Sequence, residues 1–227
     1  MGYGIAVALA DEGCRVAIAG RREEKLREAA GKYRGKQPLL THAVDVADRA
    51  SVARLFQLAA SELGPVDILV NGAGLNIVHR TLAETTPEEW DLLMTINATG
   101  AFNCLQAVLP QMRERGDGLV INISSIAGKR ALKLGGVAYC ASKFAMTALG
   151  TFASLEEGKN GIRVTNIYPG EVDTPILENR PVPITPEHRA RILQPEDVAA
   201  AVVMIANLPP RAHVSELVIK PTTQEFA

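Results

Sequence analysis

The stretch Gly118–Ser125, with the sequence GLVINISS, indicates the fold class most directly. Its first part is apolar at nearly every position, which is typical of a strand covered on both faces in a parallel sheet. Ser124 and Ser125 follow this strand directly, and ligands bind beyond the carboxyl ends of such strands. The stretch therefore predicts an α/β fold and places two hydroxyls at the sheet edge where a site is expected.

Similar apolar runs recur along the chain and alternate with helical patterns. Strands are expected at Arg15–Gly20, Leu39–Val44, Asp67–Val70, Gly118–Ile123, Ile162–Tyr168 and Glu216–Ile219. Helices are expected at Ile5–Asp11, Glu23–Tyr33, Arg49–Leu63, Pro87–Arg115, Val137–Glu157 and Pro195–Asn207. This order predicts a doubly wound parallel sheet of the Rossmann type, three layers deep, in one domain spanning residues 1–227.

The irregular, proline-rich stretch Thr174–Gln194 follows a strand end. Ligands bind near such ends in parallel sheets. We therefore expect a substrate-covering loop over residues 174–194, with a short helix around Pro186–Ile192.

Composition excludes several functional classes. The 227 residues suffice for one domain with a full core. The formal net charge of −1 gives no electrostatic case for a nucleic acid or an anionic membrane as partner. The sequence contains no run of about 18 apolar residues, so no membrane span is predicted. The N-terminus also lacks the order of basic, apolar and small residues that marks a signal peptide.

Cysteine and histidine usage shows no metal or disulfide pattern. The sequence has an odd number of cysteines, and their spacing is not that of metal ligands. We therefore expect Cys14, Cys104 and Cys140 to be reduced thiols in a cytoplasmic protein. The four histidines are scattered, and no metal site is predicted.

Tyr139 and Lys143 stand four residues apart within an expected helix, so they share one face. A free tyrosine has a pKa near ~10 and is a poor base at pH 7. A nearby cation favours the phenolate and lowers that pKa. The pair can then move a proton to or from an alcohol or carbonyl oxygen, which a neighbouring serine hydroxyl can hold. Taken alone, such a pair is more often a packed aromatic ring and a solvated charge.

Further motifs accompany the pair in a fixed order. They are Asn71-Gly72-Ala73-Gly74 after an apolar run, Asn97 within Thr95–Gly100, Asn122–Ser125, and Tyr168-Pro169-Gly170 followed by Thr174. Together they resemble the short-chain dehydrogenase/reductase family over essentially the whole chain. The resemblance implies an enzyme that interconverts a carbonyl and a secondary alcohol. Hydride comes from a nicotinamide dinucleotide in such enzymes, so no metal is needed.

The resemblance also implies catalytic roles. Tyr139 is the general acid–base, and Lys143 lowers its pKa and holds the nicotinamide ribose. Ser125 holds the substrate oxygen, and it is preferred to Ser124 because it directly precedes an Ile-Ala-Gly sequence, as the family's catalytic serine does. Asn97 fixes a water that relays protons to the lysine. The alternative interpretation is that Asn97 is a polar residue that kinks the helix.

Arg21 and Arg22 follow the expected strand Arg15–Gly20, where an NAD enzyme tends to place an acid on the ribose hydroxyls. An arginine instead attracts a 2′-phosphate, so NADP is expected rather than NAD. The alternative is that both arginines merely start a charged helix. The family pattern implies further cofactor contacts from Gly2, Asp45, Val46, Asn71, Ala73, Gly74, Tyr139, Lys143, Pro169, Gly170, Val172 and Thr174.

In the family, a strand and a glycine-rich turn precede the first helix. The interval of 11 positions from Gly2 to Gly13 matches Gly2 to the third glycine of that turn, so the first strand is expected to be missing. Two interpretations are open. Met1 is an internal methionine of an enzyme that carries the strand, or the chain is a catalytically inactive fold that serves as a binding or oligomerisation module.

Substrate and assembly are less constrained. Lys129, Arg130 and Lys133 lie near the expected pocket mouth and suit an acidic substrate, although a solvated loop explains them more simply. The tail from Arg211 to Gln224 resembles a subgroup that oxidises 3-hydroxy acids and serine-like compounds, with a 3-oxoacyl thioester reductase as the second candidate. The two longest expected helices pair across subunits in the family, which implies a homodimer or homotetramer.

Overall fold

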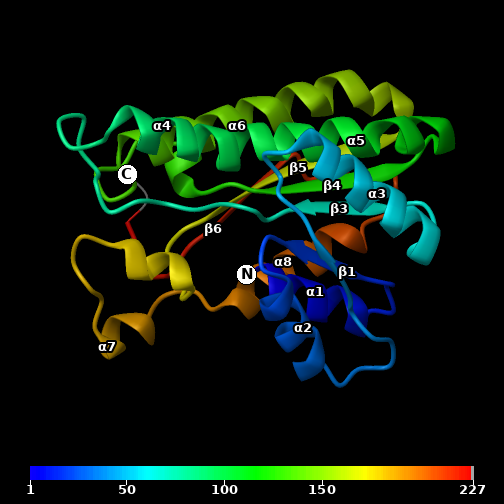
Figure 1. Ribbon diagram of the computed structural model, residues 1–227, viewed down its shortest axis with the longest axis horizontal. Helices are drawn as coiled ribbons and strands as arrows, with labels where there is room; N and C mark the ends of the chain where they lie inside the picture. Colours follow the sequence, from blue (N-terminus) through cyan, green and yellow to red (C-terminus); the bar gives the residue numbers. More distant parts are fainter. Residues whose placement is uncertain (226–227) are drawn as a thin grey trace.

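The computed structural model of the protein describes residues 1–225, and it confirms an α/β fold with parallel strands (Figure 1). The strands are β1 Ala17–Gly20, β2 Leu40–Ala43, β3 Ile68–Asn71, β4 Gly118–Ile123, β5 Ile162–Pro169 and β6 Glu216–Ile219. The helices are α1 Gly2–Asp11, α2 Glu23–Lys32, α3 Arg49–Leu63, α4 Pro87–Leu93, α5 Gly100–Arg115, α6 Val137–Glu157, α7 Pro186–Arg189 and α8 Pro195–Ala206. The strands and helices that the sequence predicts are therefore present, with small shifts at their ends.

Short 3₁₀ and π segments complete the architecture. The expected helix over 87–115 contains a π-helical segment, η1 Met94–Thr99, between α4 and α5. Short 3₁₀ helices, η2 Ile126–Gly128, η3 Gly158–Asn160 and η4 Pro175–Asn179, follow β4, α6 and β5 respectively. Sequence periodicity gave no signal for these segments, because each is shorter than two helical turns.

Local sequence explains where several helices begin. Thr86 and Glu89 form a capping box at the start of α4, with Pro87 in its first turn. Asp48 caps α3 by accepting a hydrogen bond from the main-chain N–H of Ala50. Such caps satisfy N–H groups that have no partner within the helix.

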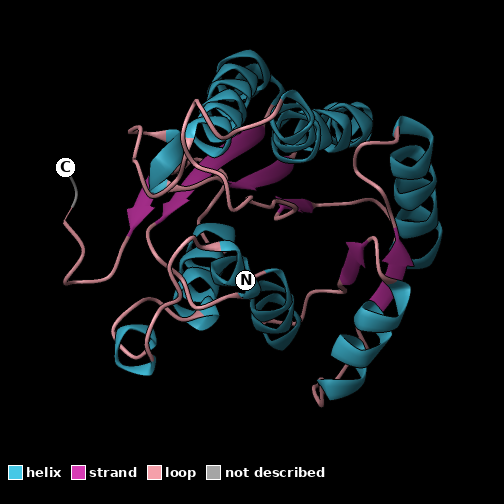
Figure 2. Cartoon of the chain, turned by 60° about the vertical axis from the view of Figure 1, so that its left-hand side comes forward, coloured by secondary structure: helices cyan, strands magenta, loops and turns pink. Residues whose placement is uncertain are grey.

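The sheet is divided into two parts, so the continuous sheet of a Rossmann fold is interrupted. One part pairs β1 with β2, and the other has the order β3-β4-β5-β6. Every pairing is parallel, and Figure 2 shows the two strands of the first part standing apart from the other four. The backbone N–H and C=O groups of an edge strand need a neighbouring strand as hydrogen-bond partner. No strand of residues 1–225 lies between β1 and β3 to supply it.

Helices cover both faces of the four-stranded sheet, as the apolar strand β4 predicts (Figures 1 and 2). Leu119 and Ile121 of β4 pack with α1 and α8, whereas Val120 packs with α3 and α5. All residues of β4 are buried. Alternate side chains of a strand point to opposite faces, so β4 contributes to two cores at once.

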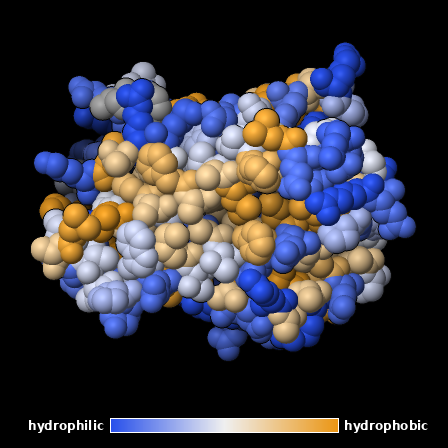
Figure 3. All heavy atoms as spheres, turned by 90° about the horizontal axis from the view of Figure 1, so that it is seen from above, coloured by the Kyte–Doolittle hydropathy of each residue, from blue (hydrophilic) through white to orange (hydrophobic). Residues whose placement is uncertain are grey.

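The outer face of α4, α5 and α6 carries exposed apolar side chains, which gather in one region when the molecule is seen from above (Figure 3). They are Trp90, Leu92, Phe102, Phe144, Phe152 and Leu155. Phe152 and Leu155 are 67% and 79% exposed. A patch of this kind on a folded domain marks an interaction surface.

Residues 87–115 form the one helical stretch in the described part of the chain that is long and apolar enough to cross a membrane by length and composition. Within its most apolar window, 56% is buried inside the molecule, as in the core helix of a globular domain. Cys14, Cys104 and Cys140 are free thiols, and the last two are buried.

Candidate active site

A cavity of about 120 Å³ lies at the carboxyl ends of β4 and β5. The predicted site residues that line it are Ser125, Tyr139, Pro169, Gly170, Val172 and Thr174. The fold thus brings together candidates that are up to 49 positions apart in the sequence. This convergence follows from parallel strands, whose carboxyl ends meet at one edge of the sheet.

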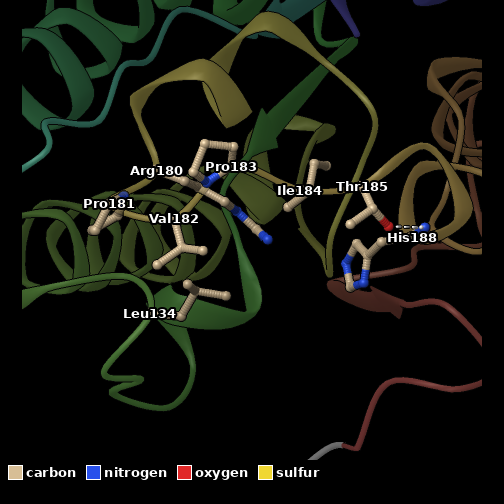
Figure 4. Close-up of a pocket in the computed structure, with 8 residues that line it drawn as sticks. All are labelled: Leu134, Arg180, Pro181, Val182, Pro183, Ile184, Thr185 and His188. Atoms are coloured by element: carbon tan, nitrogen blue, oxygen red, sulfur yellow. Dashed lines mark hydrogen bonds between the residues drawn. The ribbon is translucent and has the colours of Figure 1, made fainter.

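A larger hollow of about 360 Å³ lies under the loop that precedes α7 (Figure 4). Its lining contains none of the predicted catalytic residues. Leu134 and Arg180 border both spaces. The loop over 174–194 therefore lies beside the candidate site, where a substrate-covering segment is expected.

Tyr139 and Lys143 lie on one face of α6, as their spacing predicts. The Lys143 ammonium is 5.9 Å from the centroid of the Tyr139 ring. Its Nζ donates a hydrogen bond of 2.9 Å to the main-chain oxygen of Ile123 at the end of β4. Lys143 is only 4% exposed, so β4 and α6 enclose its charge within the protein.

The environment shifts both groups toward their neutral forms. Burial lowers the pKa of Lys143 to about 8. Burial also raises the pKa of Tyr139, and the hydrogen bond with Ser125 and the charge of Arg80 offset only part of that rise. Burial therefore outweighs the lowering of the Tyr139 pKa that a nearby cation favours, and the effect of Lys143 on that pKa stays a prediction. Spacing along a helix reports proximity, whereas the pKa also depends on how deeply tertiary packing buries each group.

Ser125 and Ser124 occupy different environments. Ser125 is half-buried at the cavity, and its Oγ accepts a hydrogen bond of 3.1 Å from the main-chain N–H of Ala127. Ser124 is buried, and its Oγ donates to the main-chain oxygen of Lys143 at 3.3 Å. A Cβ on Gly128 would come within 2.5 Å of the Ser124 Oγ, so the chain is closely packed there. Ser125 is thus the hydroxyl that faces the cavity with the fewest competing contacts.

Asn97 lies in the π-helical segment η1 and is fully buried. Its side-chain amide exchanges two hydrogen bonds with the main chain of Leu75, at 2.9 and 3.0 Å. It also donates to the Ser142 Oγ at 2.9 Å, and that hydroxyl donates to the main-chain oxygen of Tyr139 at 2.9 Å. Asn97 therefore ties the turn after β3 to the helix that carries Tyr139. The helix-kinking interpretation agrees with the π-helix, and the water relay stays a prediction.

Gly74 connects the motif after β3 to the catalytic candidates. A Cβ at Gly74 would lie 3.3 Å from the Lys143 Nζ and 3.4 Å from the Asn97 Oδ1. These contacts are tighter than ordinary van der Waals packing, so a side chain at this position would require Lys143 and Asn97 to shift by a few tenths of an ångström. Ala73, by contrast, is exposed beside it.

Asn71 forms one end of a row of asparagines across three neighbouring strands. Its Nδ2 donates to the Asn122 Oδ1 at 2.9 Å, and the Asn122 Nδ2 donates to the Asn166 Oδ1 at 3.0 Å. The three asparagines occupy one register of β3, β4 and β5. A Cβ on Gly150 of α6 would lie 2.1 Å from the Asn166 Oδ1. The asparagine ladder therefore requires a glycine in the helix that covers it.

The predicted adenosine-side residues lie at the ends of β1 and β2. Arg21 and Arg22 are exposed, and within residues 1–225 neither forms an ion pair. Glu23 instead pairs with Arg27 at 2.5 Å. Asp45 is also exposed, and its Oδ1 accepts a hydrogen bond of 3.0 Å from the main-chain N–H of Ala47. The two arginines are thus available to an external anion.

The remaining predicted cofactor residues lie at two other places. Val46 packs against Gly100, where a Cβ would come within 2.5 Å of it. Gly2 opens α1, which has no side-chain cap. Met1 lines the same cavity as Gly170 and Thr174, so the start of α1 lies at the cavity edge. Its first N–H groups and helix dipole favour an anion at that place.

The loop over 174–194 is fastened to its base by charges. Glu171 pairs with Arg180 at 3.0 Å and with His188 at 2.6 Å. Asp173 pairs with Arg189. An isolated parallel bridge joins Val172 to Leu193 at the two ends of the loop.

The three cations near the expected pocket mouth fit the simpler interpretation of a surface loop, because all three are exposed. Lys129, Arg130 and Lys133 do not line the cavity, and Lys129 pairs with Glu216. Arg80 and Arg180 line it instead, together with Asn76 and Gln224. These four residues lie in irregular segments and in the tail, where no periodic pattern indicates which way a side chain points.

Comparisons with known proteins agree with this geometry. The chain matches the short chain dehydrogenase family over residues 1–182. An uncharacterised oxidoreductase of Staphylococcus saprophyticus is 34% identical over 223 residues, covering 97% of this chain and 92% of the relative. Because the match spans most of both proteins, it leaves the expected absence of a first strand unconfirmed.

Two solved structures are similar over nearly the whole chain. An alcohol dehydrogenase from the archaeon Thermococcus sibiricus, complexed with 5-hydroxy-NADP, has a TM-score of 0.87 at 28% identity and covers 99% of this chain and 93% of its own. The closed form of serine dehydrogenase complexed with NADP⁺ has a TM-score of 0.85 at 28% identity. The match covers 100% of this chain and 93% of the serine dehydrogenase chain. The chain therefore belongs to the short-chain dehydrogenase/reductase family of NAD(P)-dependent oxidoreductases.

Proposed function

We propose that the protein interconverts a carbonyl and a secondary alcohol with NADP as its cofactor. The observation that carries the proposal is the shared cavity of Ser125 and Tyr139, with Lys143 one helical turn behind the tyrosine. These groups are the donor, the acid–base and the cation that the chemistry needs around one oxygen atom.

The chain's own residues handle the proton. In the reduction direction, the Tyr139 phenol donates its proton to the substrate oxygen while the Ser125 hydroxyl hydrogen-bonds to the same atom. The raised pKa of Tyr139 keeps the phenol protonated at neutral pH, which suits an acid. The bound dinucleotide supplies the hydride. Lys143 binds the nicotinamide ribose in this scheme, and Asn97 holds the water that returns a proton.

NADP is the favoured cofactor because the residues present fit its groups. Arg21 and Arg22 are exposed cations without a carboxylate partner in residues 1–225, as recognition of a 2′-phosphate requires. The two similar solved structures named above carry NADP or a derivative of it.

The test of this function is a turnover assay with a panel of aldehydes, ketones and secondary alcohols. We expect reduction with NADPH, or oxidation with NADP⁺, followed by the absorbance of the reduced nicotinamide. Dinucleotide binding without turnover of any panel member would favour the alternative of a non-catalytic binding or oligomerisation module.

The open edges of β1 and β3 motivate a second part of the proposal. A parallel strand between them would join the two parts of the sheet in the order expected of a Rossmann fold. Five apolar side chains buried there would contribute on the order of 10 kcal/mol. We propose that full-strength dinucleotide binding needs such a strand, followed by a glycine-rich turn that leads into α1.

Calorimetric titration with NADPH tests the strand. The 227-residue chain is compared with a version that has a strand and glycine-rich turn added before Met1. Much weaker binding by the 227-residue chain is expected, because its phosphate site offers only the start of α1. Equal affinities would show that the added strand is dispensable.

The proposed substrate is a 3-hydroxy acid or a serine-like compound, with a 3-oxoacyl thioester as the alternative. The tail that resembles the corresponding subgroup lies at the site, because Gln224 lines the cavity and its Oε1 accepts a hydrogen bond of 3.0 Å from the N–H of Glu171. Similarity to serine dehydrogenase supports the same choice. Relative kcat/KM values for the two substrate types decide between them.

A homodimer or homotetramer in the cytoplasm is the proposed working form. The exposed apolar face of α4, α5 and α6 supports it, since this face would be covered by a second copy (Figure 3). Light scattering should therefore give a mass above that of one chain, and Phe152→Glu should lower it. A monomeric wild-type protein would contradict the assembly.

A further inference from the structure

Arg80 occupies a fixed place on the cavity wall that also holds Ser125 and Tyr139. It comes from the irregular segment between β3 and α4. Its main-chain oxygen accepts a hydrogen bond of 3.0 Å from Val137, the first residue of α6. A Cβ on Gly136 would lie 2.9 Å from the Arg80 Cα and Cδ. Arg80 is therefore packed against the start of the helix that presents Tyr139.

The Arg80 guanidinium is held by main-chain oxygens alone. Its Nη2 donates to Asn179 at 2.7 Å, and its Nη1 donates to Gly135 at 3.2 Å. The Nε is buried without a hydrogen-bond partner, and no carboxylate of residues 1–225 forms an ion pair with the group. A guanidinium has five N–H donors, so most of them remain unused.

Arg180 provides a contrast on the same wall. It is paired with Glu171, whose carboxylate also bonds His188. Figure 4 shows Arg180 extending into the hollow that the loop encloses. Its charge is thus balanced within the protein, whereas that of Arg80 is not. Burial and the neighbouring Arg180 charge both lower the pKa of Arg80, which is the effect of a cation lacking a counter-ion.

We propose that Arg80 binds a carboxylate of the substrate while Ser125 and Tyr139 hold the reacting oxygen. The substrate is then a hydroxy acid or an oxo acid rather than a neutral alcohol, ketone or thioester. A planar guanidinium matches a carboxylate with two parallel hydrogen bonds, and its anchoring by Gly135 and Asn179 fixes the direction from which the anion binds. This inference rests on the proposed function, because it uses the same cavity.

The first experiment compares acids with their methyl esters, which differ in charge at one end only. Lactate, 3-hydroxybutyrate and 4-hydroxypentanoate, each with its ester, are oxidised with NADP⁺ by the wild type and by Arg80→Gln. At least one acid should exceed its ester in wild-type kcat/KM. Arg80→Gln should lower kcat/KM for that acid by about tenfold to a hundredfold, mainly through KM, because charge-assisted hydrogen bonds are lost. The ester should change by less than about threefold.

Two further variants sharpen the comparison. Arg80→Lys keeps the positive charge but lacks the planar guanidinium, so its loss of kcat/KM for the acid should be intermediate. If Arg80→Gln does not fold, Arg80→Lys takes its place in the comparison. Lys129→Gln is the matched control, because Lys129 pairs with Glu216 outside the cavity lining. It should leave the ratio of acid to ester unchanged.

The outcomes separate this inference from the proposed function. Turnover of esters in preference to every acid, or an equal loss for acid and ester in Arg80→Gln, would overturn the carboxylate site while leaving the oxidoreductase function intact. If the wild type turns over neither class, calorimetric binding of 3-hydroxybutyrate decides. Binding by the wild type and not by Arg80→Gln supports the site, and equal or absent binding by both rejects it.

Discussion

The ammonium of Lys143 donates a hydrogen bond of 2.9 Å to the main-chain oxygen of Ile123, the last residue of β4. This bond fixes the lysine between the central strand and α6. It also leaves a cation in a place where solvent does not reach it, with a pKa lowered to about 8. The arrangement has a consequence for stability that can be measured separately from catalysis.

Lys143→Met should stabilise the protein at pH 7 by up to about 3 kcal/mol, since one pKa unit corresponds to about 1.36 kcal/mol. The unfolded chain holds the lysine proton up to a higher pH than the folded chain does. Wild-type stability therefore gains from this group as pH rises from about 8 toward 10.5. The advantage of the variant should shrink over that range and stay constant below it.

Urea unfolding of both proteins between pH 7 and 10 measures that difference. Other titrating groups, such as Cys104, affect both proteins alike and cancel in the comparison. Lys133→Met, at an exposed position, should show no such pH dependence relative to the wild type. A constant difference between wild type and Lys143→Met at every pH would refute the account of the buried cation.

Arg21→Ala should weaken NADPH binding by at least about tenfold, because charge-assisted hydrogen bonds are worth about 1.5–3 kcal/mol. NADH binding should change by less than about twofold, since NADH lacks the 2′-phosphate. Calorimetry with both dinucleotides gives the two ratios. Arg27→Ala is the control, because Arg27 pairs with Glu23 and is expected to contact no cofactor. Equal weakening of both cofactors, or a wild-type preference for NADH, would contradict the assignment.

Gly150→Ala should destabilise the protein by about 1–3 kcal/mol or more, as overpacking of a core does. Its Cβ would lie 2.1 Å from the Asn166 Oδ1 and 2.5 Å from the Asn122 Nδ2. Gly158→Ala is the matched control, since nothing lies within 4 Å and the backbone there is helical. It should be neutral or slightly stabilising. Thermal unfolding that ranks the two variants in the opposite order would show that the ladder tolerates displacement.

Local patterns were sufficient to predict the strands, the long helices and the face shared by Tyr139 and Lys143. The apolar run of β4 identified a strand buried on both sides, and the structure buries every residue of it. The strand ends also indicated where Ser125 and Gly170 would meet. These features depend on periodicity and on the common direction of parallel strands.

Other features depend on tertiary contacts that no local pattern reports. The raised pKa of Tyr139 follows from burial, which spacing along α6 does not report. Arg80 lies in a segment without periodicity, so no sequence pattern predicted that it lines the cavity. Asn166 is one of several polar residues in β5, and only the register of β4 and β5 shows its partner.

We propose above all that Tyr139 transfers the proton. Tyr139→Phe removes only the phenolic oxygen and should lower kcat by at least about 100-fold, since general acid–base groups contribute ~10²–10⁴. The Kd for NADPH should stay within about threefold of the wild type, because the ring and the packing of α6 remain. Tyr33→Phe, which loses an exposed hydrogen bond to Asp11, should keep full activity. Turnover by Tyr139→Phe within tenfold of the wild-type rate, at unchanged cofactor affinity, would contradict the assignment.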